Sequence, residues 1–232
     1  MYTLHIGNKN YSSWSLRPWV LMSELGIGFQ EQNHVFGQDF QRTIDGRSPS
    51  RKVPVLHHEG RIVWDSLAIA EYLADRHPGV WPTDVNARAW ARCAAAEMHS
   101  GFQALRNTCG MNCGIRVKLN AQSDALKKDL ARIGELFVEG LGKFGGPFLA
   151  GPKFGAVDAF FCPVAFRVQS YGLELPAAAA QYVQRLLALP SMKRWYEAAL
   201  AEPFRDQDHE VEIAAAGRIL EDLRKPLAAA PA

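Results

Sequence analysis

Polar side chains gather at the starts of two predicted helices in the first third of the chain. Residues 8 to 19, NKNYSSWSLRPW, place Ser12, Ser13 and Ser15 directly ahead of an apolar helical pattern. In WDSLAI, Asp65 and Ser66 stand at the start of a second helix. There a carboxylate suits an ammonium group, while a hydroxyl and the free N–H groups of the first turn suit a carboxylate. A plain helix cap would satisfy Ser66 equally well, so both interpretations stay open at this point.

A third stretch, KVPVL at residues 52 to 56, opens a predicted β-hairpin. Its two β-rich runs, VPVLHH and RIVW, are separated only by EG. A proline is tolerated where a strand begins, so this stretch alone does not distinguish a binding element from an ordinary strand start.

The elements that must position these residues follow from the periodicity of the apolar side chains. YTLHI and GFQEQNHVF alternate as strands do, and SLRPWVLMSELG between them has helical spacing and stops at Gly26. Ser15 is the expected N-cap of that helix. The hairpin and the helix DSLAIAEYLADRH follow, ending before Pro78. The order βαβ then ββα predicts one compact α/β domain, with a right-handed parallel crossover in its first half.

HPGVWPTDVNAR marks the predicted boundary, because two prolines and a glycine interrupt the pattern there. The predicted division is a first domain at 1–80, a linker at 81–86 and an all-α domain at 87–232. From residue 87 onward the apolar stripes are helical, and the last six residues, LAAAPA, are expected to be a frayed tail. Met98, Phe102, Met111 and Ile115 form an apolar set assigned to the first long helix of this second domain.

Composition excludes several classes of protein. The 232 residues are 48% hydrophobic and 22% charged, with a formal net charge of +2, so no charge excess recruits nucleic acid. The start of the chain does not have the pattern of a secretory signal, and no stretch approaches the roughly 20 apolar residues of a membrane span. A cytoplasmic protein without a membrane partner is therefore expected.

The motifs together resemble the soluble glutathione S-transferases, and the resemblance covers essentially the whole chain. It implies a thioredoxin-like N-terminal domain followed by an all-α helical bundle, with glutathione as the co-substrate. It also implies a homodimer and a role in detoxification, with a small hydrophobic electrophile bound by the second domain. Core packing, the electrophile pocket and the dimer interface are the three uses left open for the apolar set that begins at Met98.

The resemblance assigns roles to the residues of the second and third motifs. Pro54 matches the family's cis-proline, and the backbone of Val53 matches the residue that pairs with the cysteinyl backbone of glutathione like an added strand. Asp65 and Ser66 match the family's acidic or amide residue and serine, which hold the γ-glutamyl end. Asp65 is one methylene shorter than the family's Glu or Gln. Lys52, or Arg51 before it, is a candidate for the glycine carboxylate.

The opening stretch is similar to the zeta-type pattern of two serines and a cysteine before the helix. This similarity sets Ser12 on the catalytic serine and Ser13 on the second serine, with Trp14 in place of the cysteine. A hydroxyl that donates to the glutathione sulfur lowers the pKa of the thiol, as does a helix N-terminus. Ser13 is the alternative to Ser12. Tyr11 is a third candidate hydroxyl, and Arg17 is a nearby charge that could support the site.

The positions of the cysteines argue against thiol-reductase chemistry. Members of the family that act as thiol reductases form a mixed disulfide through a cysteine in this loop. The first cysteine of this chain is Cys93, so that reaction is not expected. Cys109 and Cys113, even with His99, lack the spacing and the fourth ligand of a metal site, so no metal is expected. Asp158 fits a capping box, a folding role, although Gly155 occupies its N-cap.

Three functions are carried forward. The first is a serine-type glutathione transferase that attacks a small hydrophobic electrophile. The second uses the same thiolate for a cis-trans isomerisation of the maleylacetoacetate type. The third is a non-catalytic binding module that retains the transferase fold, and the presence of both KVPVL and the Asp-Ser pair argues against it.

Overall fold

A four-stranded sheet forms the framework of the N-terminal part. The computed structural model describes residues 1–226. The strands are β1 (Tyr2–Gly7), β2 (Phe29–His34), β3 (Val55–His58) and β4 (Arg61–Val63), in the spatial order β2-β1-β3-β4. β1 runs parallel to β2 and antiparallel to β3, and β3 and β4 form a hairpin. At its tip Glu59 and Gly60 both have positive φ, as a two-residue hairpin turn of the favoured twist requires.

Three helices accompany this sheet: α1 (Ser13–Glu24), α2 (Phe40–Ile44) and α3 (Ser66–Ala74). The predicted order βαβ-ββα is confirmed, with the short α2 as an addition. α1 begins at Ser13, three residues earlier than an N-cap at Ser15 predicts. Ser12 occupies the N-cap position, and Ser15 lies within the first turn. The assignment of Ser15 as the N-cap was therefore wrong, because three closely spaced hydroxyl residues allow several starting points and the backbone uses the first.

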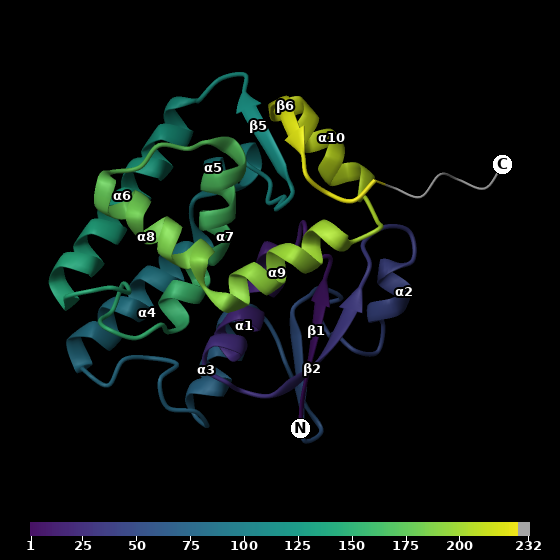
Figure 1. Cartoon of the computed structure of the whole chain (residues 1–232). Coiled ribbons are helices and arrows are strands. Elements are labelled where there is room, and N and C mark those ends of the chain that lie inside the picture. Colours follow the sequence, from purple (N-terminus) through teal and green to yellow (C-terminus); the bar gives the residue numbers. More distant parts are fainter. Residues whose placement is uncertain (227–232) are drawn as a thin grey trace.

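The rest of the described chain is mostly helical. Its helices are α4 (Val85–Ser100), α5 (Gln103–Thr108), α6 (Asp124–Phe144), α7 (Ala156–Tyr171), α8 (Ala177–Ala188), α9 (Pro190–Ala201) and α10 (Gln207–Ala216). Two strands, β5 (Ile115–Leu119) and β6 (Gly217–Asp222), pair in antiparallel fashion. Figure 1 shows β6 and α10 beside β5, on the side of the molecule where α2 also lies. The predicted fold class holds, except that the second part is not all-helical. Residues 227–232, predicted as a tail, lie outside the described residues.

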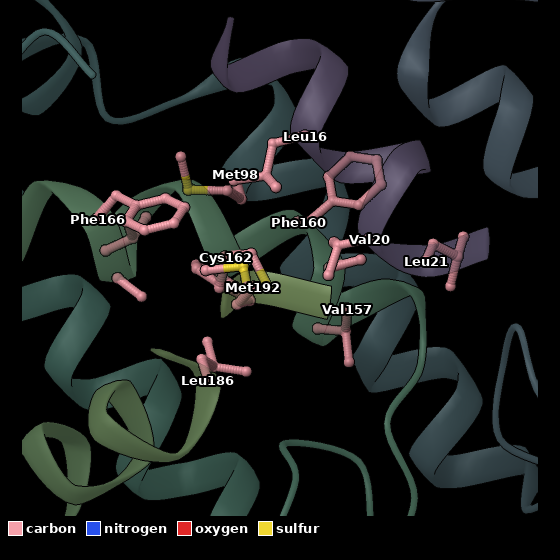
Figure 2. Close-up of a cluster of buried hydrophobic side chains, with 14 of the residues drawn as sticks. Leu16, Val20, Leu21, Met98, Val157, Phe160, Cys162, Phe166, Leu186 and Met192 are labelled. Carbon is pink, nitrogen blue, oxygen red and sulfur yellow. The ribbon is translucent and has the colours of Figure 1, made fainter. Parts of the chain in front are cut away.

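α7 is the central helix of the hydrophobic core, and nearly every one of its side chains is buried. Figure 2 shows Phe160 from α7 beside Leu16 and Val20 from α1, and Cys162 and Phe166 from α7 belong to the same cluster of buried side chains. Because α1 packs directly against α7, one continuous core joins the sheet-containing part to the helical part. The N-terminus of α1, where the serine cluster lies, is thereby fixed relative to both.

The apolar set that begins at Met98 belongs to the interior of the chain. Met98, Phe102, Met111 and Ile115 are all buried within it, so a face that pairs with a second protomer is not their role. Their assignment to one long helix was wrong. α4 ends at Ser100, where Phe102 adopts a left-handed φ of 60°, and Ile115 begins β5. No helix in the described part of the chain is long and apolar enough to cross a membrane.

Candidate active site

Two cavities that share part of their walls lie at the N-terminus of α1. The first has a volume of about 330 Å³ and is lined by Ser12 and Ser13 together with residues of α5, α7 and α10. The second, of about 360 Å³, is lined by Pro54 and Asp65. Trp14, Lys52 and Val53 line both cavities. Six of the seven predicted site residues therefore come together around one continuous region, and the seventh, Ser66, lies outside both linings.

The first cavity meets the N-terminus of α1 at Ser12 and Ser13. Ser12 Oγ donates to Ser15 Oγ over 2.7 Å, and Ser15 Oγ also accepts from Gly7 N at 3.1 Å. Within the described residues, the N–H groups of Trp14 and Ser15 have no acceptor, as expected in the first turn of a helix. Two hydroxyls and two free N–H groups thus converge where the helix dipole is positive, an arrangement that stabilises an anion.

Tyr11 does not offer its hydroxyl to the cavity. Tyr11 OH donates to Glu210 Oε1 at 2.7 Å and accepts from Arg224 Nη1 at 3.3 Å. Burial, followed by the hydrogen bond to Glu210, raises the pKa of Tyr11 well above its ordinary value. The ring lines the cavity, but its hydroxyl anchors α10 and is not available to activate a thiol.

The wall shared by the two cavities includes the end of the loop before β3. The Val53–Pro54 bond is cis, as the family resemblance implies. Pairing of β3 with β1 begins at Val55, so the backbone N–H and C=O of Val53 lie outside the sheet ladder. The backbone of Lys52 is fixed by the Ser48 side chain, which accepts from its N–H at 3.2 Å and donates to its C=O at 2.8 Å. The Lys52 side chain is exposed and lines both cavities.

Asp65 and Ser66 begin α3 but differ in accessibility. Asp65 Oδ1 accepts from Leu67 N at 2.9 Å, which caps the helix, and Oδ2 lies 3.2 Å from His99 Nε2. Burial lowers the pKa of His99, with Asp65 as the main opposing influence. Ser66 follows Asp65 in the chain and is buried, and its Oγ has no hydrogen-bond partner among the described residues. Such an unsatisfied hydroxyl is costly unless a bound group reaches it.

Trp14 lines both cavities, and two arginine side chains lie against its ring. The Arg17 guanidinium lies 4.1 Å from the Trp14 ring centroid, and that of Arg106 lies 4.9 Å from it. Arg17 is fully buried, its three guanidinium nitrogens lack partners among the described residues, and burial lowers its pKa. It does not reach either cavity, so its expected support of the site is limited to the electric field behind Trp14.

Sequence reasoning missed most of the residues that the helical part adds to the first cavity. The exception is Met111, for which the electrophile pocket was one of three open uses and which lines this cavity. The missed residues are Arg106 from α5, Gly110 from the following loop, Arg167 from α7, and His209 and Glu212 from α10. Each is an isolated residue in an ordinary amphipathic or loop segment. No local pattern marks them, because only the tertiary packing of distant helices brings them to one cavity.

The cysteines play no visible part in the site. Cys109 and Cys113 are buried, and burial raises the pKa of Cys109 to about 12. Cys113 Sγ donates to the backbone C=O of Lys9 at 3.5 Å. Within residues 1–226, no group of three or more His, Cys, Asp or Glu side chains is arranged to hold a metal ion.

Comparisons with known proteins agree with this geometry. A family model described as "Glutathione S-transferase, N-terminal domain" matches residues 11–76. A probable glutathione S-transferase of Oryza sativa subsp. indica is 30% identical over 170 residues, which cover 69% of this chain and 71% of the relative. A probable maleylacetoacetate isomerase of Caenorhabditis elegans is 24% identical over 176 residues, covering 72% of this chain and 78% of that protein.

A solved structure supports the same fold. The glutathione transferase homologue from Burkholderia, crystallised with bound glutathione, is 24% identical to this chain. It covers 85% of this chain and 97% of its own length, with a TM-score of 0.65. At this level of identity the likeness establishes the fold and leaves the chemistry to be argued from the site itself.

Proposed function

The chain belongs to the glutathione S-transferase family, and on that premise we propose that Ser12 stabilises the thiolate of bound glutathione for attack on a small electrophile. The observation that carries this proposal is the shared wall of the two cavities. A tripeptide held along Lys52, Val53, Pro54 and Asp65 would run toward the N-terminus of α1. Its sulfur would then meet the hydroxyls and free N–H groups there.

The groups that line the second cavity, together with the adjacent Ser66, match the charges of glutathione. The Asp65 carboxylate suits the γ-glutamyl ammonium, and the unpartnered Ser66 hydroxyl, with the start of α3, suits the neighbouring carboxylate. Val53 offers an N–H and a C=O outside the sheet for the cysteinyl backbone. Lys52 suits the glycine carboxylate. With the predicted division, residues 1–80 would supply these contacts.

The hydrogen bond between Ser12 and Ser15 favours Ser12 over Ser13 as the group on the sulfur. A hydroxyl rotates, so Ser15 can donate to Ser12 while still accepting from Gly7 N, which frees the Ser12 proton for the sulfur. The result is a chain from Gly7 N–H through Ser15 and Ser12 to the thiolate, in which each bond strengthens the next. Ser13 Oγ has no such support among the described contacts.

Catalysis then requires only the glutathione thiolate and an electrophile held beside it in a fixed orientation. The sulfur lone pair forms the new bond to carbon, and either a leaving anion departs or a double bond takes up the electron pair. The first cavity holds the electrophile beside Ser12, with Trp14, Phe36 and Met111 as its apolar walls.

The test is glutathione conjugation of 1-chloro-2,4-dinitrobenzene by the wild type and by Ser12→Ala. We expect kcat/KM to fall at least tenfold in Ser12→Ala, with glutathione affinity within threefold of wild type. Ser100→Ala removes an exposed hydroxyl at the end of α4 and should leave the rate unchanged. Wild-type protein that fails to bind glutathione at millimolar concentration would favour the non-catalytic binding module instead.

The isomerase alternative has a specific observation in its favour, because the Caenorhabditis elegans relative and one from Rattus norvegicus are named maleylacetoacetate isomerases. It is tested by the glutathione-dependent cis-to-trans isomerisation of maleylacetone. Turnover that depends on Ser12 would establish it, and no turnover would remove it. A homodimer is proposed from the family and is tested by sedimentation equilibrium.

A further inference from the structure

Two arginines that line the first cavity form no ion pair with an acidic residue of the described chain. Arg106 and Arg167 both line it, together with Ser12 and Ser13. Within residues 1–226, neither arginine takes part in an ion pair. Most cavities of this kind are mainly apolar, so two unpaired guanidinium groups in one wall call for a ligand that matches them.

Backbone carbonyls hold both guanidiniums in place. Arg106 Nε donates to Gly101 O at 2.9 Å, and its Nη2 donates to Met98 O. Arg167 Nε donates to Cys109 O at 2.8 Å. Carbonyl oxygens orient a guanidinium but do not neutralise it, so both groups keep their full charge and a fixed direction.

Arg167 also retains an unused donor. It is only 4% exposed, and its Nη1 is buried without a hydrogen-bond partner in the described part of the chain. A buried charged donor left unpaired is strongly unfavourable. Arg106 lies close enough to lower the pKa of Arg167 further, beyond the effect of burial. An anion bound beside both would relieve the desolvation and the repulsion together.

The other charges around the cavity keep its sign positive. Lys52 lines it from the side shared with the second cavity, and Arg17 adds a buried charge behind Trp14. Glu212 is the acidic residue in the lining, and its side chain is exposed to solvent on α10. Asp129 accepts a hydrogen bond from Leu105 N and lies outside ion-pair distance of Arg106, although its charge partly opposes the effect of burial on the pKa of Arg106.

We propose that the second substrate is an electrophile that carries a carboxylate, bound by Arg106 and Arg167 while its apolar body lies against Trp14 and Met111. The inference rests on the proposed function, since it assumes that glutathione fills the adjoining cavity. A guanidinium binds a carboxylate in two parallel hydrogen bonds, so the arginines would fix the orientation of the electrophile as well as its affinity.

The experiment compares two glutathione conjugates that span both cavities and differ in one group. S-(4-carboxybenzyl)glutathione carries the anion, and S-(4-carbamoylbenzyl)glutathione replaces it with a neutral amide of nearly the same shape. Calorimetric titration of the wild type should show that the carboxyl conjugate binds at least tenfold more tightly. This preference should fall below threefold in Arg106→Gln and in Arg167→Gln, while binding of the carbamoyl conjugate stays unchanged.

Arg61→Gln is the matched control. It removes one positive charge from β4, outside both cavities, and should keep the preference intact. Arg106 is partly exposed, so its variant remains informative if Arg167→Gln does not fold. Equal binding of the two conjugates by the wild type, or a preference that survives in Arg106→Gln, overturns the inference alone. Failure of glutathione and of both conjugates to bind overturns the proposed function and the inference with it.

Discussion

At the scale of single residues, different side chains of the proposed site bind the tripeptide and activate its sulfur. Asp65 belongs to the first task, because its carboxylate lines the second cavity and has no place in the first. Ser12 belongs to the second, because it stands at the N-cap of α1. Variants at the two positions should therefore change different measurable quantities.

Asp65→Asn should weaken glutathione binding at least tenfold and leave the pKa of the bound thiol unchanged at saturation. Asparagine is as good an N-cap as aspartate, so α3 should keep its start, and only the charge that pairs with the γ-glutamyl ammonium is lost. Calorimetric titration gives the affinity, and ultraviolet absorbance of the saturated complex gives the thiol pKa. An affinity equal to that of the wild type would remove Asp65 from the binding site.

At the scale of elements, Asp158 supports the start of α7, the helix that carries Arg167. Its carboxylate accepts from Leu149 N, Gly155 N and Tyr182 OH, at 3.0, 2.9 and 2.7 Å. Asp158→Ala would leave three buried donors unpaired and should lower the free energy of unfolding by about 3–5 kcal/mol. Asp124→Ala, at an exposed helix start, should cost less than about 1 kcal/mol. Urea unfolding of both variants makes the comparison, and equal losses would contradict it.

The strand β1 contains a histidine that should make the fold sensitive to acid. His5 is buried against His34, at 2.9 Å between ring nitrogens, and against the His57 ring. Burial, with the neighbouring histidines and Arg47, lowers the pKa of His5 to about 4. The unfolded chain takes up this proton near pH 6.5, so the free energy of unfolding should fall as the pH drops from about 6.5 to 4.

The loss attributable to His5 is of the order of 3 kcal/mol across that window. Comparing urea unfolding of the wild type and His5→Gln between pH 7.5 and 4.5 isolates it from the contributions of other groups. We expect the wild type to lose more stability than the variant as the pH falls. Parallel pH profiles would show that His5 is not the group responsible.

Comparing the predicted elements with the observed ones shows which parts of the fold local sequence patterns can predict. The order from β1 to α3 follows from periodicity and turn residues, which are local signals, whereas the cis bond before Pro54 was expected only from the resemblance to the family. The strands β5 and β6 were missed because Ile115–Leu119 pairs with residues about 100 positions further along the chain. The roles of Arg106 and Arg167 in the first cavity were missed for the same reason, because nothing in the sequence of α5 or α7 indicates that these two helices lie close together.

At the scale of the whole molecule, the active site depends on contacts between distant parts of the chain. The packing of α1 on α7 fixes the serine cluster against the helical part. Tyr11 ties the same loop to α10 through Glu210, and Arg224 pairs with that glutamate. The first cavity is therefore formed by residues from near both ends of the described chain, and neither part contains it alone.

The central claim, that the start of α1 activates glutathione through Ser12, is tested most directly by ultraviolet difference titration of the bound thiolate against pH. The wild type should show a thiol pKa below that of free glutathione. Ser12→Ala should raise it by about 1–2 units, because a hydrogen bond to a charged group contributes about 1.5–3 kcal/mol. Ser15→Ala should raise it by less, and Ser13→Ala by under about half a unit. A wild-type complex whose thiol titrates like free glutathione would contradict the account.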